Sequence, residues 1–400
     1  MRYGIADPPT TTCMADNDLI APELRPGMRC VLTVLGGQAV DWPVEEAEWE
    51  AALTLATKER VLPWLLSQLE ETSASIDPYI QALLHDAQRQ NSIEAFFWCG
   101  ELKGLLTAFH VEDLPVIPLK GPALAERVYG GVKMRTCRDL DLLVHGHDFA
   151  RAQILLGRLG FVAGESNDFH QRWIRGAMMV ELHRDVADPH LFDFDIEGAW
   201  RQARPTTFHG IPTWQFSPED EYLFLCIHAV REEFGRLGVV LDVALATHLL
   251  GGSTERRFRP EVERLCRHGI LGYSIATQCI PQLCAQVPLL EDPKVVHALG
   301  PVAKDFTNSL LTESDTYLSW VGRQRFHVQL ETPGLYRLRR RCIHLWKMFR
   351  HGLGADISEP DFAFAGQWGF TRPWQVRVVR PFRVAQAIRL HRVRPFKLGR

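Results

Sequence analysis

The sequence predicts an α+β fold in which one α/β segment lies between two helical regions. Three observations lead to this prediction. Residues 116–144 read as a strand, a tight turn, a helix and a second strand. Residues 28–110 carry apolar side chains at helical spacing, and a helix start at residue 217 leads into two further apolar helical runs. We therefore divide the chain into residues 1–27, 28–112, 113–204, 205–351 and 352–400.

The N-terminal part begins with a stretch, residues 1–27, that is rich in Pro, Thr and Asp and predicts a poorly ordered tail. Residues 28–112 predict a helical region, because VEEAEWEAALTLATKERVLPWLLSQLE has apolar residues three and four apart. Pro63 predicts a break or kink in this run. Asp77 and Pro78 predict the start of a second long helical segment, with Asp77 as its cap.

The central region, residues 113–204, alternates between strand and helix signals. Short apolar runs predict strands, and amphipathic stretches with a glycine stop predict helices. The expected order is a strand at 115–119, a helix at 122–129, a strand at 139–144, a helix from about Asp148 to Gly160 and a strand at 177–183.

Two carboxylates lie on the predicted strand at 139–144. Asp139 and Asp141 are two residues apart, so both project from the same face of the strand. They repel each other unless a cation binds between them, and Mg²⁺ prefers oxygen ligands of this kind. An isolated D-x-D pair is more often a solvated turn or a salt-bridge partner. The apolar residues around it favour the metal site here: Leu140, Leu142, Leu143 and Val144.

Two further features lie on either side of this pair. Lys120 and Gly121 form a turn at a helix start, where free backbone N–H groups and the helix dipole favour phosphate. Glu181 and His183 are two apart on the predicted strand at 177–183, so they share a face. If that strand pairs beside the D-x-D strand, Glu181 becomes a third carboxylate in the cluster. Phosphate next to carboxylates is the arrangement that metal-assisted transfer at phosphorus needs.

The C-terminal region, residues 205–351, opens with a stretch at 205–218 that we expect to be rich in turns. Ser217 and Pro218 then predict a helix start, and further helices are expected over about 258–350. The helix after Ser217 contains His228, which on an apolar helix is more often a hydrogen-bonded core residue than a catalyst. The next helix contains Asp242, whose buried charge requires a partner from the neighbouring helix or an arginine.

The composition is that of an ordinary globular chain. The 400 residues are 46% hydrophobic and 23% charged, and the net charge of −3 gives no general case for nucleic-acid binding. The nine cysteines are scattered without a C-x-x-C pair, which indicates neither a disulfide framework nor a zinc site. No apolar run is long enough to span a bilayer, and the N-terminus lacks an apolar signal core. We expect a cytoplasmic protein with reduced thiols.

The last stretch, residues 372–400, holds nine Lys and Arg residues and no Asp or Glu. Such a segment either binds an anionic partner, nucleic acid or a membrane surface, or packs on an acidic face of its own domain. We favour packing within the chain, because the whole protein is slightly acidic.

Several motifs together resemble a known family. LKGPALAERVY, then R-x-x-R-D-L-D-L-L-V, V-E-L-H, L-C-I-H-A and L-D-V-A are similar in order and spacing to the bacterial "uncharacterised nucleotidyltransferase" family of the DNA polymerase beta-like superfamily. The resemblance covers roughly residues 45–250. It implies a small mixed β-sheet with flanking helices and an appended helical bundle. It also implies transfer of a nucleoside monophosphate from an NTP to an acceptor hydroxyl, with release of pyrophosphate.

The resemblance also implies roles for individual residues. Asp139, Asp141 and Glu181 match the carboxylates that bind Mg²⁺ or Mn²⁺ and carry catalysis. Nucleotide contact falls to Lys120, Gly121, Arg135 and Arg138, although Arg138 is equally a local partner for Asp139. Three further residues match recurring polar positions: His183, His228 and Asp242. We expect them to lie around the metal ligands without binding the metal themselves.

This chain departs from the superfamily at two places. Its Gly-Ser turn is Lys-Gly here, so triphosphate contact would rest on backbone amides and the ammonium group of Lys120. Many relatives carry Asp where this chain has Glu181, and the extra methylene moves the carboxylate.

Two alternatives belong to other functional classes. One is a catalytically inactive nucleotidyltransferase fold that serves as a binding or scaffold protein. The other is a nucleotidyltransferase that acts on nucleic acid, which we do not favour because no nucleic-acid module is recognisable. The expected partners are an NTP and an acceptor whose class, small molecule, peptide or protein, stays open.

Overall fold

The computed structural model describes residues 24–37, 45–71, 78–189, 192, 194–232, 234–250, 271–272 and 274–280, together with residues 283, 303, 304, 307, 310, 311 and 372. Asp77, most of the predicted tail at 1–27 and most of the expected helices at 258–350 lie outside the described residues. The predicted extension at 352–400 also lies outside them, apart from Arg372.

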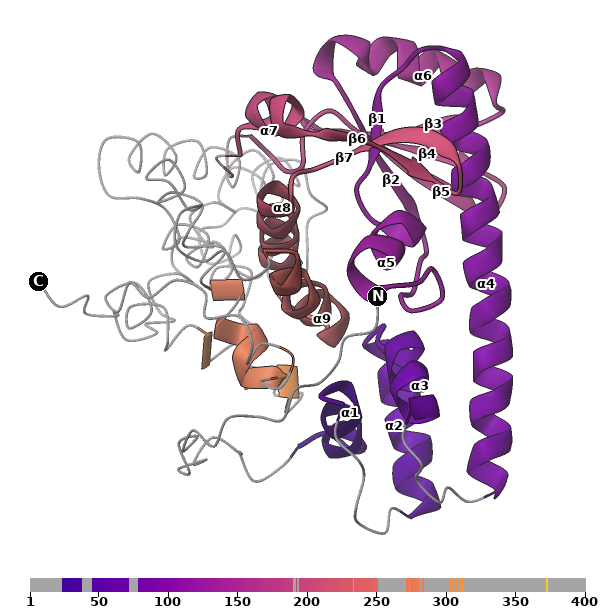
Figure 1. The fold of residues 1–400 in the computed structure, drawn as a ribbon, viewed down its shortest axis with the longest axis vertical. Coiled ribbons are helices and arrows are strands. Elements are labelled where there is room, and N and C mark those ends of the chain that lie inside the picture. The colour runs from indigo at the N-terminus through magenta and orange to yellow at the C-terminus, as the bar shows by residue number, and fades with distance from the viewer. Residues whose placement is uncertain are drawn as a thin grey trace, which may run out of the picture. The chain divides into compact units, whose positions relative to one another are not determined.

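Four helices form the N-terminal region, as the apolar spacing predicts: α1 Met28–Leu35, α2 Glu46–Lys58, α3 Leu62–Glu71 and α4 Pro78–Val111. The predicted break near Pro63 is confirmed. Helix α2 ends at Lys58, and Pro63 lies in the first turn of α3, where its missing N–H group costs no hydrogen bond. Helix α4 runs for 34 residues and contacts α3, α5 and β7 along its length (Figure 1).

The central region forms a mixed five-stranded sheet in the order β1-β2-β5-β4-β3. Strand β1 pairs antiparallel with β2, β2 pairs parallel with β5, and the other pairs are antiparallel. The α+β class is thereby confirmed. The strands are β1 Val116–Pro118, β2 Leu140–Val144, β3 Val162–Ser166, β4 His170–Arg175 and β5 Met178–His183.

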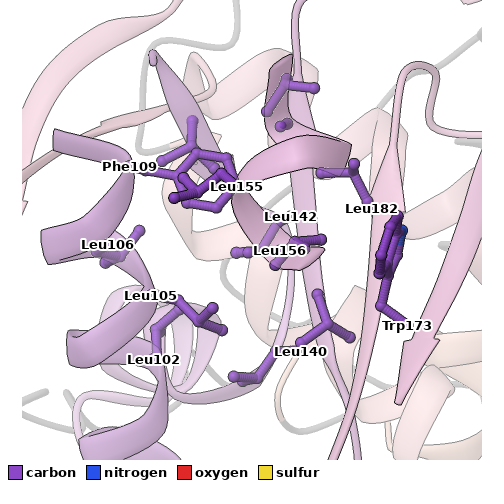
Figure 2. Close-up of a cluster of buried hydrophobic side chains, with 14 of the residues drawn as sticks. Leu102, Leu105, Leu106, Phe109, Leu140, Leu142, Leu155, Leu156, Trp173 and Leu182 are labelled. Carbon is purple, nitrogen blue, oxygen red and sulfur yellow. The ribbon is translucent and has the colours of Figure 1, made fainter. Parts of the chain in front are cut away.

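Helices connect these strands and cover one face of the sheet. The connecting elements are α5 Gly121–Tyr129, the 3-10 turn η1 Gly146–Asp148 and α6 Phe149–Arg158. Helices α4 and α6 pack on the sheet, and their leucines meet those of β2 and β5 in the core of Figure 2. Helix α6 ends before Gly160, whose φ of 83° lies in the left-handed region that stops a helix.

The stretch at 205–218 differs from the expectation, because it forms a hairpin where turns were expected. Strand β6, Arg204–Phe208, pairs antiparallel with β7, Ile211–Gln215. The two linking residues, His209 and Gly210, have φ values of 47° and 83°. Positive φ at both positions is typical of the tight two-residue hairpin turn, which matches the twist of the strands.

Three helices and one 3-10 turn follow along the chain: α7 Ile196–Gln202, α8 Pro218–Arg231, α9 Leu237–Ala246 and η2 Thr247–Leu250. The described residues 271–272 and 274–279, within the region where further helices are predicted, are also helical. The helix start predicted at Ser217 is confirmed, because Ser217 Oγ accepts a hydrogen bond of 3.1 Å from the backbone N–H of Asp220. Every helix in the described part of the chain is too short or too polar to cross a lipid bilayer.

Candidate active site

The sheet has an apolar face and a polar face. The β2–β5 register pairs Asp141 with Glu181, and the β4–β5 register pairs Arg172 with Glu181 and His170 with His183. Because side chains alternate along a strand, these five residues share the face that points away from the leucine core. The prediction that the strand containing Glu181 lies beside the D-x-D strand is confirmed.

Asp141 is the centre of this polar face, with 1% of its surface exposed. Its Oδ1 lies 3.1 Å from Lys120 Nζ and 3.2 Å from His183 Nε2. Its Oδ2 is buried and has no hydrogen-bond partner among the residues that the structure describes. Burial alone would raise the pKa of this carboxyl, but Lys120 and His183 outweigh it and hold the pKa below its usual range. Asp141 is therefore a charged carboxylate with one oxygen unused.

Glu181 lies next to Asp141 and shares its histidine. Its Oε2 is 3.7 Å from His183 Nε2, and its Oε1 is 3.3 Å from Arg172 Nη2. Burial raises the pKa of Glu181, but the contact with His183 reverses the effect and brings the pKa to about 2. The same two carboxylates raise the pKa of the His183 imidazole, although burial opposes them. The two carboxylates thus favour the charged form of His183, and His183 favours the charged form of Glu181.

Asp139 lies just before β2, one residue outside the strand, whereas the predicted strand began at this residue. Its side chain is half-buried and forms no ion pair with the other described residues. Burial and the charge of Asp141 raise its pKa, while Lys120 opposes the rise. Asp139 thus contributes a third carboxyl group within the electrostatic reach of Asp141 and Glu181, as the D-x-D pattern indicates.

The turn at Lys120 and Gly121 begins α5, as predicted. Gly121 has a φ of 66°, and a Cβ atom here would lie 3.3 Å from both Cys137 Sγ and Leu140 Cδ2. Glycine therefore allows this turn to lie close against the D-x-D segment. Pro122 follows in the first turn and has no N–H to offer, and no side chain caps the helix start. The lysine, rather than the amides alone, brings positive charge to the carboxylates.

Arg135 pairs with Asp242 and not with the carboxylates of the polar face. Its Nε and Nη2 donate to the two carboxylate oxygens of Asp242, each at 2.8 Å. Tyr129 Oη donates to Asp242 Oδ1 at 2.5 Å. The expectation that an arginine pairs with Asp242 is confirmed, and we interpret Arg135 as an anchor rather than a nucleotide contact. Arg138 is exposed and forms no ion pair with any residue in the described part of the chain.

His228 on α8 is buried near the same charges. Burial lowers the pKa of its imidazole well below the usual range, and Lys120 and Arg231 lower it further. Its Nδ1 has no hydrogen-bond partner among the described residues, although the apolar helix predicts a hydrogen-bonded core histidine. Arg231, one turn later, donates to the carbonyl of Val186 at 3.2 Å.

His170 and Arg172 belong to this cluster but were not predicted from the sequence. Both come from β4, which the sequence pattern does not reveal. The sequence of β4, HQRWIR, does not alternate clearly between apolar and polar residues. The neighbouring strand β3 is exposed at every residue and has no such alternation either. His170 Nε2 lies 3.7 Å from Glu181 Oε1. Burial lowers the pKa of His170 to about 4, and the neighbouring His183 contributes to the shift.

Taken as a whole, the polar face combines carboxylates, imidazoles and one lysine within a few ångströms. An unused carboxylate oxygen offers a ligand to a dication, and the lysine offers a charge to an anion. This donor set fits chemistry at a phosphate group, where metal and cation neutralise the same substrate.

A family model and two solved structures are similar to parts of this chain. The family model described as uncharacterised nucleotidyltransferase matches residues 45–276. The solution structure of the antibiotic-resistance factor ANT(2'')-Ia is 19% identical, with a TM-score of 0.31, and the match covers 38% of this chain and 84% of that one. The crystal structure of ANT(2")-Ia in complex with adenylyl-2"-tobramycin is 19% identical, with a TM-score of 0.32, over 42% of this chain and 93% of that one.

No curated protein matches the chain. The family model, in contrast, spans more than half of the 400 residues, and it includes all of the polar face described above. The resemblance that the LKG, RDLDLLV and VELH motifs indicate is confirmed by this match. The chain belongs to the uncharacterised nucleotidyltransferase family.

Proposed function

We propose that the protein transfers a nucleoside monophosphate from an NTP to an acceptor hydroxyl and releases pyrophosphate, with a divalent metal held by Asp139, Asp141 and Glu181. One observation carries this proposal. Asp141 and Glu181 lie in register on neighbouring parallel strands, on the polar face of the sheet. Asp141 is buried and Glu181 half-buried. Three basic side chains offset part of their charge: Lys120, His183 and Arg172. The second oxygen of Asp141 has no partner among the described residues and is open to a further cation.

The residues present fit a dication. Asp141 Oδ2 is buried without a partner among the described residues, and an unused buried oxygen is costly unless a ligand binds it. Mg²⁺ and Mn²⁺ take oxygen ligands from carboxylates and from substrate phosphates. A bound dication would neutralise charge on the phosphates and on the leaving pyrophosphate.

The chain's own side chains would bind and orient the nucleotide. Lys120 lies at the edge of the carboxylates with its side chain 14% exposed, so its ammonium group is within reach of a phosphate that enters the site. The backbone around Gly121 approaches the D-x-D segment closely and would support the same phosphate. The ionised carboxylates, Glu181 among them, are acceptors only and would take the proton of the attacking hydroxyl.

Calorimetric titration of the full-length protein with an NTP, with and without Mg²⁺, tests the proposal. We expect NTP binding that requires Mg²⁺ in the wild type and that is lost in Asp139→Asn/Asp141→Asn. Asp148→Asn is the matched control, because Asp148 is also buried but pairs with Arg151 outside the cluster. The control should bind NTP as the wild type does. Melting curves establish that all variants are folded.

Two outcomes would contradict the proposal. Equal NTP binding by the folded double variant would remove the carboxylates from the site. A folded wild type that binds no NTP at any Mg²⁺ concentration would favour the alternative, in which the fold serves as a catalytically inactive binding or scaffold protein.

A further inference from the structure

The two histidines of the polar face differ in what their far ring nitrogens contact. Each histidine directs Nε2 toward Glu181, and the donor atoms of His170, Glu181 and His183 all lie within 4.8 Å of one another. By distance alone, both imidazoles are candidate metal ligands. A neutral imidazole binds a metal only through the nitrogen that lacks a proton, and the partner of the other nitrogen decides which one that is.

His183 is oriented as a ligand. Its Nδ1 lies 3.2 Å from the backbone carbonyl oxygen of Asp185. A carbonyl oxygen only accepts, so Nδ1 carries the proton and donates it. Nε2 faces carboxylates that also only accept, so without a metal it carries a proton as well. A dication that displaces this proton would leave a neutral ring with its lone pair on Nε2. A ring nitrogen bonded to a backbone carbonyl is the usual support of a metal-bound histidine.

His170 is oriented as a donor instead. Asn167 Oδ1 accepts hydrogen bonds from the backbone N–H groups of Phe169, at 3.0 Å, and of His170, at 2.8 Å. This assigns the amide, so Asn167 Nδ2 is the group 3.2 Å from His170 Nδ1. The amide nitrogen donates, Nδ1 accepts, and the proton of the neutral ring therefore lies on Nε2. His170 thus presents an N–H to Glu181, with no lone pair for a metal.

Of the two carboxylate distances around His183, the one to Asp141 is that of atoms that share one ion, and the one to Glu181 is longer. Its Nε2 lies 3.2 Å from Asp141 Oδ1 and 3.7 Å from Glu181 Oε2. Bonds of about 2.1 Å at octahedral or tetrahedral angles place the donor atoms about 3.0–3.4 Å apart. The three side chains come from adjacent strands of one sheet, which holds these distances without a loop. A small shift of Glu181 is enough to complete the set.

We propose that His183 is a metal ligand through Nε2, beside Asp141 and Glu181, and that the site therefore takes a first-row transition-metal dication in preference to Mg²⁺. The inference rests on the metal-dependent transfer proposed above and adds the identity of the metal to it. Imidazole nitrogen binds first-row transition metals well, whereas Mg²⁺ prefers an all-oxygen shell. His170 is assigned to the hydrogen-bond support of Glu181.

Pulsed electron paramagnetic resonance of the full-length protein loaded with Mn²⁺ tests this assignment, because it detects a ¹⁴N nucleus bonded directly to the metal. We expect coupling to one imidazole nitrogen in the wild type, its loss in His183→Gln and its retention in His170→Gln. Calorimetry should show Mn²⁺ affinity falling at least about tenfold in His183→Gln, with Mg²⁺ affinity not lowered. Melting curves show that the variants are folded.

The outcomes separate this inference from the function on which it rests. Bound Mn²⁺ without nitrogen coupling overturns the ligand assignment, while the carboxylate site of the proposed transfer stands. Coupling that persists in His183→Gln and disappears in His170→Gln overturns it in favour of the other histidine. A folded wild type that binds neither Mn²⁺ nor Mg²⁺, with or without NTP, contradicts both proposals.

Discussion

Among the described residues, two groups of charges with little exposure to solvent are arranged differently. We call the two ion pairs of the first group the anchor pairs. Arg135, in the loop after α5, meets Asp242 on α9 through two contacts of 2.8 Å. Arg127 on α5 meets Glu221 on α8 through two contacts of 2.9 Å. In the carboxylate cluster of Asp141 and Glu181, contacts are single, longer and shared, at 3.1–3.7 Å. There, one oxygen of Asp141 has no partner among the described residues.

The difference teaches how to tell a structural charge from a functional one. A carboxylate whose two oxygens both accept from one guanidinium has each oxygen engaged by a protein partner, and the guanidinium is equally engaged. A carboxylate with an unused oxygen can still bind a ligand. Leaving that oxygen unpaired destabilises the fold, which is tolerated where ligand binding offsets the loss. By this criterion Asp242 and Glu221 hold helices together, whereas Asp141 is the residue that we propose to bind substrate or metal.

The largest effect is expected from breaking an anchor pair. Asp242→Ala would leave the guanidinium of Arg135 and the hydroxyl of Tyr129 buried without their acceptor. We expect a loss of about 3–5 kcal/mol in the free energy of unfolding, measured by urea titration. The double variant Arg135→Met/Asp242→Leu should lose less than the single one, because it leaves no unpaired charge. A double variant as unstable as Asp242→Ala would show that the unpaired charge is not what destabilises the single variant.

A smaller effect is expected from titrating the cluster. The pKa of His170 is lowered to about 4 in the fold, against 6.5 in the unfolded chain. The unfolded state therefore binds more protons between these values, so stability falls as pH decreases from 6.5 to about 4. His170→Gln should flatten this fall by about 1–3 kcal/mol, as urea titrations at several pH values would measure.

His110→Gln is the control for this pH experiment, because His110 is exposed on α4. The contribution of His183 does not enter the same pH range. Its raised pKa means that it is protonated in both states below 6.5, so it affects stability only at higher pH. If His170→Gln leaves the slope between pH 6.5 and 4 unchanged, the cluster does not hold His170 neutral.

The smallest effect is expected at the turn that brings Lys120 to the cluster. Gly121 and Gly130, at the two ends of α5, have φ values of 66° and 81°. Replacement by alanine costs about 1–2 kcal/mol at either position, since the left-handed region disfavours a Cβ. At Gly121 the new atom also meets Cys137 and Leu140 at 3.3 Å, whereas nothing lies within 4 Å at Gly130.

We therefore expect Gly121→Ala to be less stable than Gly130→Ala by about 1 kcal/mol, measured as the difference between their free energies of unfolding. Gly121→Ala should also weaken NTP binding, because it moves Lys120 away from Asp141. Equal stability of the two variants would mean that the neighbours of Gly121 yield easily and that the turn is not held against the D-x-D segment.

Much of the fold could be predicted from local patterns. The apolar spacing, the Ser217 cap and the stop at Gly160 each act within one turn or strand, so the sequence carries them directly. Strands β3 and β4 and the β6–β7 hairpin could not be predicted in this way. Strand β3 has no buried residue, and the sequence of the hairpin reads as turns because it is rich in Pro, Thr and Gly.

The sequence by itself determined which carboxylates could act together. The two-residue spacing in V-E-L-H sets Glu181 and His183 on one face of β5. The same spacing keeps Asp139, one residue before β2, close in the chain to Asp141. Only the tertiary structure decided which charged residues pair with each other and which side chains keep an atom available for a ligand. Arg135 and Asp242 are 107 residues apart, and no local rule reveals that they meet. Nor does any local rule show that Asp185 directs one imidazole toward the carboxylates, while Asn167 makes the other a donor. Such hydrogen bonds depend on distances that packing alone sets.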